Sequence, residues 1–227
     1  MKVMAISDLH GFLPEKYKDI DMDVLCICGD ISPLNIQLDE GLVYQWIKSR
    51  FIPWIESLKC KKCFLIAGNH DFIFYHNKNN LLSKLFDGTK VEYLQDKLSY
   101  FTFEDKTIKV YGTPWCHIFY NWAFMIDDYS LHQKFSKIPD HIDILMTHDV
   151  PYNTCDIILE KELYTGEHIG NIPLKENIVG KDIKYVLCGH LHTTSHEPFY
   201  MGDTIIKQCS VVNEWCHLTY EPYIFEL

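Results

Sequence analysis

Short apolar runs that do not alternate with polar residues are the feature of this sequence that most constrains its fold. A run of this kind is typical of a β-strand buried on both faces, because successive side chains point to opposite sides of a sheet. Such strands occur where helices or a second sheet cover both faces. The runs lie at residues 3–6, 24–28, 64–67, 108–111, 142–146 and 185–188.

Helical patterns separate the first of these runs. Residues 40–58 place apolar side chains near a 3.6-residue period, and we expect Pro53 to kink this helix or divide it in two. Shorter helices are expected at 79–86 and 129–136. Residues from 196 onward are typical of a β-meander, with Gly202-Asp203 as a turn. The order predicts an α/β fold in which two packed, mixed sheets are flanked by helices.

The composition predicts one domain over residues 1–227, since the chain has no internal repeat and no linker rich in proline, glycine and serine. No apolar run approaches the ~20 residues that span a bilayer, and Asp8 interrupts the N-terminal run too early for a signal peptide. We therefore expect a cytoplasmic protein with no membrane partner. The nine cysteines are expected to be free thiols. Cys60 and Cys63 form one C-x-x-C pair, whereas a structural zinc needs four ligands.

The charge of the chain bears on its partners. The net charge of −10 argues against long nucleic acid as the main partner, because that binding neutralises phosphates with Lys and Arg. Arg50 is the single arginine, so an arginine clamp cannot be the means of binding phosphate. Metal ions or backbone amides are expected to take that role. The sequence favours no particular oligomeric state.

Polar side chains of the metal-binding kinds follow most of the apolar runs at the carboxyl end, which in open α/β sheets is the usual ligand-binding edge. Each short motif occurs by chance, but their repetition at the same structural point indicates one site. The nitrogen and oxygen ligands suit Mn, Fe, Zn or Ni better than Ca or Mg, and a carboxylate can bridge two ions ~3.5–4 Å apart. The residues are Asp8, His10, Asp30, Asn69, His70, Asp71, His148, His190 and His192.

The ordered set D-x-H, G-D, G-N-H-D, H and G-H-x-H resembles the calcineurin-like metallophosphoesterase superfamily. The resemblance implies a four-layer α-β-β-α sandwich, two divalent transition-metal ions with Mn²⁺ the first expectation, and in-line attack of a metal-bridging hydroxide on phosphorus. Asp30 would bridge the two ions. One ion would be held by Asp8, His10, Asp30 and His192, and the other by Asp30, Asn69, His148 and His190.

The same resemblance assigns His70 and Asp71 to catalysis. His70 would contact the phosphate and protonate or stabilise the leaving oxygen, and Asp71 would hold its imidazole in orientation. General-acid help of this kind typically contributes 10²–10⁴-fold. Asn69 and His70 are therefore expected to contact substrate as well.

The segment "GTPWCHIFYNWAF" is a candidate substrate wall, and Trp115 is the residue of this segment expected to contact substrate. Trp115, Phe119 and Trp122 are equally well explained as core residues. Aromatic faces beside a phosphate site can stack a base, at roughly 1–3 kcal/mol. His117 is expected to lie on the surface.

Further motifs indicate a branch of the superfamily. "GDIS" replaces the G-D-x-V-D-R-G of Ser/Thr protein phosphatases, and His70 is present where retromer-type scaffold relatives lack it. The stretches "LIAGNHD", "VYGTPW", "DILMTHD" and "NEWCHLTYEP" resemble the small metallophosphoesterase-domain phosphodiesterases. This implies a phosphodiesterase of small phosphodiesters such as cyclic nucleotides. A phosphomonoesterase, a nuclease and a metal-stabilised binding module with vestigial hydrolysis are the alternatives.

Overall fold

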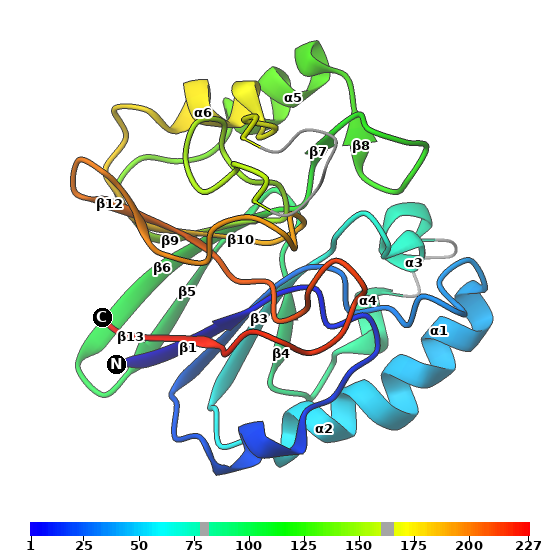
Figure 1. Cartoon of the computed structure of the whole chain (residues 1–227). Coiled ribbons are helices and arrows are strands. Elements are labelled where there is room, and N and C mark those ends of the chain that lie inside the picture. The colour runs from blue at the N-terminus through cyan, green and yellow to red at the C-terminus, as the bar shows by residue number, and fades with distance from the viewer. Residues whose placement is uncertain (78–81, 160–165) are drawn as a thin grey trace.

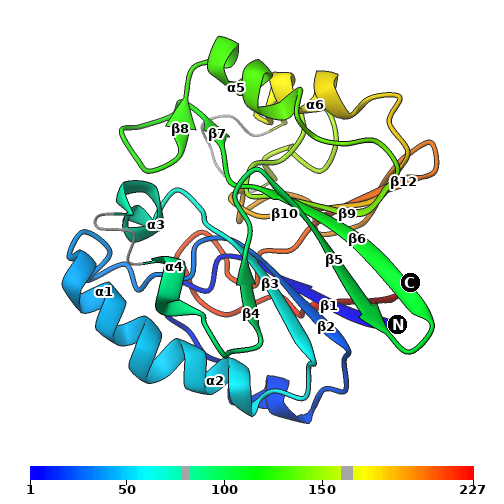
Figure 2. The ribbon, with the colours of Figure 1, turned by 180° about the vertical axis from the view of Figure 1, so that it is seen from behind.

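Two mixed β-sheets pack face to face in the computed structural model, which describes residues 1–77, 82–159 and 166–227 (Figure 1). Helices α1 (Glu40–Trp46) and α2 (Ile52–Ser57) cover the outer face of one sheet. Helices α5 (Asp128–Phe135) and α6 (Ile172–Ile178) cover the outer face of the other, as the reverse view shows (Figure 2). The four layers α-β-β-α confirm the predicted fold class.

The first sheet has the strand order β13-β1-β2-β3-β4. Its inner strands are parallel, and only β13 at one edge is antiparallel to its neighbour β1. Parallel neighbours place the carboxyl ends of β1, β2 and β3 at the same edge. The strands are β1 (Lys2–Ile6), β2 (Val24–Cys28), β3 (Lys62–Ile66), β4 (Val91–Tyr93) and β13 (Tyr223–Glu226).

The second sheet has the order β11-β12-β10-β9-β6-β5. Strands β12, β10, β9 and β6 are parallel, while β11 and β5 pair antiparallel at the two edges. A short separate pair is formed by β7 (Cys116–His117) and β8 (Met125–Ile126). The strands of the large sheet are β5 (Lys97–Phe103), β6 (Lys106–Thr113), β9 (Ile142–Thr147), β10 (Ile183–Cys188), β11 (Phe199–Met201) and β12 (Thr204–Gln208).

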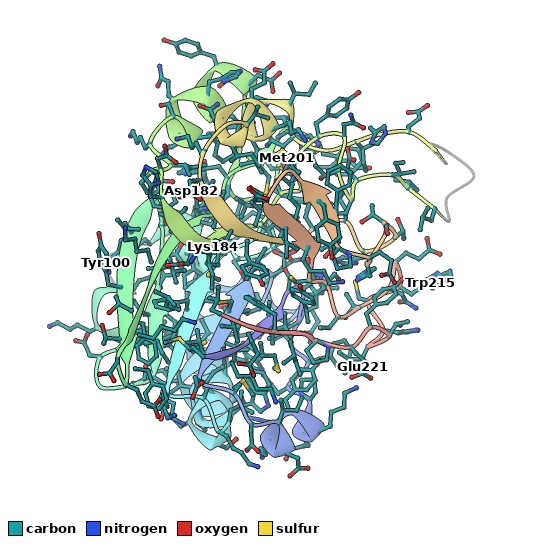
Figure 3. All side chains as sticks on the ribbon, turned by 90° about the vertical axis from the view of Figure 1, so that its left-hand side faces the viewer. Tyr100, Asp182, Lys184, Met201, Trp215 and Glu221 are labelled. Atoms are coloured by element: carbon teal, nitrogen blue, oxygen red, sulfur yellow. The ribbon has the colours of Figure 1, made fainter. Side chains whose placement is uncertain are left out.

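The unbroken apolar runs are explained by burial on both sides of each sheet. In β2, Val24, Cys26 and Cys28 belong to the apolar cluster that both sheets share between them. Leu25 and Ile27 point the other way, into the larger cluster that includes the covering helices. All five side chains are fully buried, and side chains fill the space between the sheets (Figure 3). A strand with polar residues at alternate positions could not satisfy both clusters.

The helical segment expected at 40–58 is continuous but not regular. A π-helical turn, η2 (Ile47–Phe51), joins α1 to α2, and the N–H of Ile52 donates to the carbonyl of Ile47. Pro53 follows within the first turn of α2, where its missing N–H is tolerated. The π turn thus accommodates Pro53 without dividing the helix.

The other helices differ from the expectations in extent. α5 lies one residue from the expected 129–136. α4 (Leu82–Leu85) lies within the expected 79–86 and ends one residue early, while residues 79–81 lie outside the described chain. The patterns missed η1 (Glu15–Asp19), α3 (Phe72–His76) and α6, which are short. Among the described residues no helix is both long and apolar enough to cross a membrane.

The expected C-terminal meander is wrong. β11 and β12 do form a hairpin at the predicted Gly202-Asp203 turn. β12 then lies parallel to β10, and β13 pairs with β1 in the other sheet. The chain between β12 and β13 crosses from one sheet to the other, with a bridge from Ser210 to Ser7 on the way. This crossing brings the segment after β12 to the edge where β1 ends.

Candidate active site

The predicted ligands come together because the strands that precede them end at one edge of the two sheets. These strands are β1, β2 and β3 of the first sheet and β9 and β10 of the second. The loops that follow them carry the side chains into a shared, buried site. The ligands so placed are Asp8 and His10 after β1, Asp30 after β2, Asn69 after β3, His148 after β9, and His190 and His192 after β10.

The backbone at this edge is strained. Asp8, His10, Asp30 and His190 all have positive φ, at 59°, 44°, 54° and 69°. Non-glycine residues in this region cost of order 1–3 kcal/mol and persist where the surrounding structure imposes them. Here the N–H of His10 donates to the carbonyl of Asp30 at 2.9 Å, which holds the two loops together. The fold thus stabilises a ligand arrangement that the isolated loops would not adopt.

Gly68 permits a close approach of three of these loops. A Cβ at this position would lie 2.2 Å from Asp30 Oδ1 and 2.6 Å from His148 Cε1. Because no real Cβ makes such contacts, only glycine allows the loop before Asn69 to pass so close to Asp30.

One ligand set gathers around His192. Its Nε2 lies 3.3 Å from Asp8 Oδ1 and 3.4 Å from Nε2 of His10. His10 Nε2 lies 3.9 Å from Asp30 Oδ2. The carbonyl of Asn213 is 3.2 Å from the other ring nitrogen of His192, Nδ1, and fixes the ring. Ring nitrogens of metal-binding histidines are commonly oriented by a backbone carbonyl in this way.

The second ligand set gathers around Asn69. Its Oδ1 lies 2.9 Å from His148 Nε2 and 2.8 Å from His190 Nδ1. His148 Nε2 is also 3.4 Å from Asp30 Oδ2, and His148 Nδ1 lies 2.7 Å from the carbonyl of Cys28. Asp30 Oδ2 therefore faces both sets, as a bridging carboxylate must.

The donor atoms fit divalent metal ions. Carboxylate oxygens, an amide oxygen and imidazole nitrogens are ligand types that first-row transition-metal ions bind. Among the described residues, His10 Nδ1 and Asn69 Nδ2 are buried without a hydrogen-bond partner. Such unpartnered polar atoms are rare in a protein interior, and here they indicate a site that binds a ligand besides the protein's own polar groups.

Burial and charge divide the four imidazoles into two pairs. Burial lowers the pKa of both His10 and His190 to about 4, so these rings are neutral at pH 7. Burial acts in the same direction on His148 and His192, but nearby buried carboxylates outweigh it and raise their pKa values to about 9 and about 10. An ion that binds the second pair has to displace a proton from each ring.

The expected pairing of Asp71 with His70 is wrong. Both oxygens of Asp71 accept hydrogen bonds elsewhere, from Gly68 N at 2.9 Å and from Ser32 N and Oγ at 3.0 and 2.6 Å. Nδ1 of His70 instead lies 2.6 Å from Oε1 of Gln37. Asp71 thus holds the turn after β3 in shape, while Gln37, which no motif singled out, orients the imidazole.

A cavity of about 590 Å³ opens beside the two ligand sets. Its polar end is lined by Asp30, Asn69, His70, His190 and His192. Its walls are mostly apolar, and the described lining residues include no lysine or arginine. The remaining lining residues are His117, Phe119, Trp122, Ile158, Ile169, Leu191, Thr193 and Glu214.

The assignment of Trp115 to this wall is wrong. Trp115 is buried, its Nε1 donates to both oxygens of Asp96 at 2.9 Å, and its ring packs edge-on against Phe124. Phe119 and Trp122 of the same segment do line the cavity, and the Trp122 ring centroid lies 4.7 Å from that of His70. Trp115 precedes β7 and turns into the core, whereas the loop after β7 reaches the cavity.

His117 lies in the cavity and not on the surface as expected. Its Nδ1 lies 2.7 Å from Oδ2 of Asp149, and its backbone N–H donates to the same oxygen. Asp149 is fully buried and also accepts from Asn171 Nδ2 at 2.8 Å. The Asp149 carboxylate raises the pKa of His117, so the ring is biased toward its cationic form. His117 belongs to the aromatic segment, and Asp149 directly follows His148. Neither residue alone indicates that the two side chains meet.

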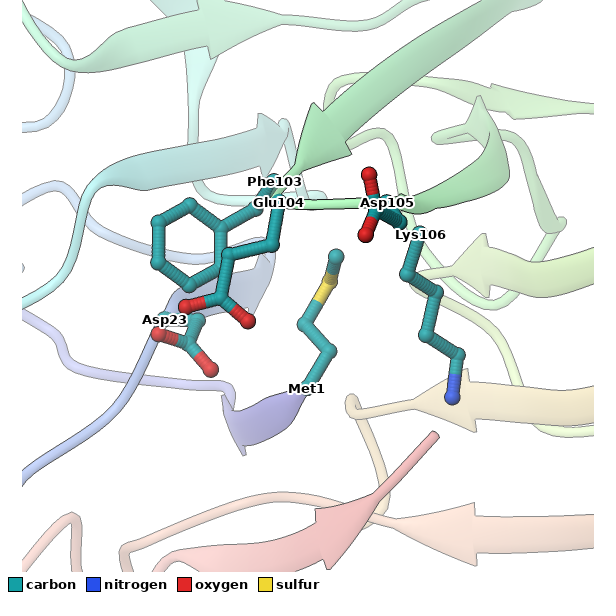
Figure 4. Close-up of a pocket in the computed structure, with 6 residues that line it drawn as sticks. All are labelled: Met1, Asp23, Phe103, Glu104, Asp105 and Lys106. Atoms are coloured by element: carbon teal, nitrogen blue, oxygen red, sulfur yellow. The ribbon is translucent and has the colours of Figure 1, made fainter.

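A second hollow of about 430 Å³ lies at the opposite end of the sheets, beside the N-terminus and the β5–β6 turn (Figure 4). It is lined by Met1, Asp23, Phe103, Glu104, Asp105 and Lys106. Its described lining has no histidine or cysteine and shares no residue with the ligand sets, so we assign it no role in the chemistry.

Known proteins resemble this chain in sequence and in fold. The sequence of human metallophosphoesterase domain-containing protein 1 is 24% identical over 97% of this chain and 68% of that protein. A Caenorhabditis elegans UPF0046 protein is 28% identical over all of this chain and 81% of that protein. TT1561 of Thermus thermophilus has a similar fold, with a TM-score of 0.59 and 12% identity over 91% of this chain and 88% of that one.

The Mycobacterium tuberculosis phosphopantetheinyl hydrolase also shares the fold, with a TM-score of 0.52 and 11% identity over 95% of this chain and 90% of that one. At such low identities these two structures support the fold alone. The model of the calcineurin-like phosphoesterase family matches residues 1–194, a range that contains both ligand sets. The chain belongs to the calcineurin-like phosphoesterase family, and this membership supports a metal-dependent phosphoesterase.

Proposed function

We propose that this protein is a phosphodiesterase that uses two divalent transition-metal ions, Mn²⁺ first among them, to hydrolyse small phosphodiesters. The observation that carries the proposal is the position of Asp30, whose Oδ2 faces both ligand sets at the polar end of the cavity. Divalent ions bound there would polarise the phosphate and activate water. One ion is assigned to Asp8, His10, Asp30 and His192, and the other to Asp30, Asn69, His148 and His190.

His70 is proposed as the group that donates a proton to the leaving oxygen. Its backbone N–H donates to Asp30 Oδ1 at 2.8 Å, which ties the residue to the bridging carboxylate. With Nδ1 directed at Gln37, its Nε2 is the ring nitrogen left for substrate. His70 lines the cavity between the ligands and Trp122, where a leaving group has to sit.

The charge of the cavity supports a diester over a monoester substrate. A phosphodiester carries one negative charge near neutral pH, whereas a monoester carries close to two. The described lining residues offer no lysine or arginine to balance a second charge, and Glu214 adds a negative one. His117, which is biased toward its cationic form, is already paired with the Asp149 carboxylate. The apolar walls suit the two organic substituents of a diester, and Trp122 and Phe119 can each stack a base or aryl ring at about 1–3 kcal/mol.

The size of the cavity and the net charge of the chain bear on its partners, and its cysteines bear on its location. A cavity of about 590 Å³ accommodates a small molecule, and the net charge of −10 disfavours long nucleic acid. A cytoplasmic location is proposed because all nine cysteines are free, which suits a reducing compartment.

The experiment that tests the proposal compares initial rates on a bis-aryl phosphate, the matching aryl phosphate and single-stranded DNA, with manganese, nickel and zinc each supplied. We expect the bis-aryl phosphate to be hydrolysed fastest by kcat/KM. A faster rate on the monoester or on DNA would assign the site to a phosphomonoesterase or a nuclease. Metal uptake with no turnover on any ester would leave a binding module.

A further inference from the structure

The loop after β12 is built around Asn213. The N–H of Asn213 donates to the carbonyl of His217 at 3.0 Å, and the N–H of Cys216 donates to the carbonyl of Asn213 at 2.9 Å. The Asn213 side-chain oxygen accepts from the N–H groups of Trp215 and His217 at 3.1 and 3.0 Å. These bonds close residues 213–217 into a tight turn, with Trp215 at the molecular surface (Figure 3).

This turn is tied directly to the ligand set around His192. The Asn213 carbonyl that caps the turn is also the group that fixes His192 Nδ1. Glu214 lines the cavity from the same turn. The position of Cys216 relative to His192 is therefore set by two bonds to one residue.

Cys216 faces the ligands. Its Sγ and one ring nitrogen each of His10 and His192 all lie within 4.8 Å of one another. Cys216 is the only one of the nine cysteines that is not buried, and its φ of 55° places it in the left-handed region. A cysteine in that region is uncommon, and its surroundings have to impose the conformation.

A second observation indicates that these atoms surround a ligand. The His10 side chain is 1% exposed, and its Nδ1 has no hydrogen-bond partner among the described residues. The polar atoms near its Nε2 are His192 Nε2 at 3.4 Å and Asp30 Oδ2 at 3.9 Å. The Nε2 of this buried imidazole thus faces a second imidazole nitrogen and a carboxylate oxygen, with the thiol of Cys216 close to both histidines, and this convergence of donor atoms is a metal-binding arrangement.

We propose that the thiolate of Cys216 is a further ligand of the ion held by Asp8, His10 and His192. On binding, the S–H bond is exchanged for an S–metal bond, and the proton leaves to the buffer. A thiolate prefers Zn²⁺, Co²⁺ and Fe²⁺ to Mn²⁺ or Mg²⁺. The consequence is a mixed site, in which sulfur selects the ion beside Cys216. Mn²⁺, placed first in the proposed function, then stays the first expectation only for the nitrogen and oxygen set around Asn69. The inference rests on the metal binding in the proposed function but not on catalysis.

The test uses Co²⁺ as a spectroscopic probe on the metal-free protein. Thiolate ligation gives a sulfur-to-cobalt charge-transfer band in the near ultraviolet, which nitrogen and oxygen ligands do not give. We expect the band in the native protein and in Cys60→Ser, a control that removes a buried thiol just before β3. Cys216→Ser should lose the band.

Competition between zinc and manganese gives the second readout. Because even outer partners of metal ligands cost 10–100-fold in affinity, Cys216→Ser should lower zinc affinity at least about tenfold and change manganese affinity less. A Cys216→Ser protein with the native band and native zinc affinity would overturn the inference. A native protein with the band but no hydrolysis would overturn the proposed function alone, and hydrolysis without the band would overturn this inference alone.

Discussion

The contact between Gln37 and His70 allows the orientation of the His70 ring to be tested separately from its proposed role as proton donor. Replacing Gln37 by alanine removes the 2.6 Å bond to His70 Nδ1 and leaves the imidazole otherwise intact. One such bond contributes about 1 kcal/mol, so the loss of orientation should lower kcat roughly 5- to 10-fold. Replacing His70 by alanine removes the donor itself and should lower kcat about 10²- to 10⁴-fold. Neither change removes a proposed metal ligand.

The assay follows hydrolysis of a bis-aryl phosphate with saturating manganese, with metal content measured by elemental analysis in the same samples. Gln45→Ala, an exposed glutamine on α1, is the matched control and should retain the native rate. The reasoning is refuted if Gln37→Ala equals the native protein, or if it is as impaired as His70→Ala at full metal content.

Three further predictions follow from the site. Asp71→Ala should lower the free energy of unfolding by about 3 kcal/mol in urea titrations, because it strands the buried donors of the turn after β3; native stability would contradict this. Trp122→Ala should raise KM for an aryl diester about 10-fold through lost stacking, whereas Trp115→Ala should lower thermal stability and leave KM unchanged; the reverse pattern would restore Trp115 to the wall. Metal binding at pH 7 should release about two protons from the rings of His148 and His192, because their pKa values are raised to about 9 and about 10, in addition to the proton that Cys216 gives up when its thiolate binds. Affinity should therefore rise with pH, and calorimetric heats independent of buffer ionisation would refute this.

The sheets and the clustering of the proposed metal ligands could be predicted from the sequence because each rests on a local signal. An unbroken run such as residues 24–28 requires burial on both faces, and both packed clusters supply it. Ligand-type residues placed directly after such runs lie at the same edge whenever the strands are parallel. The predicted clustering of Asp8, Asp30 and His148 needed no knowledge of side-chain directions.

Other features of the site depend on side-chain direction, which sequence spacing does not give. Asp71 is adjacent to His70 in the chain, yet the turn directs its carboxylate toward Gly68 and Ser32. Gln37 reaches His70 from a segment without regular secondary structure before α1, so no periodic pattern contains the contact.

The crossing of the C-terminal chain from one sheet to the other is a second feature that local sequence patterns do not give. Residues that follow β12 were expected to continue one sheet, but they pass between sheets and bring Asn213 to His192. Strand pairing over such distances is set by packing of the whole chain, and local turn signals cannot decide it.

The proposed function depends on a two-ion site with Asp30 between the ions. Its most direct test is a titration of the metal-free protein with manganese, in which bound ions per chain and the rate on a bis-aryl phosphate are measured together. We expect two bound ions, full turnover only when both are present, and loss of at least one ion in Asp30→Ala. Full turnover in the metal-free protein, or with a single bound ion, would contradict it.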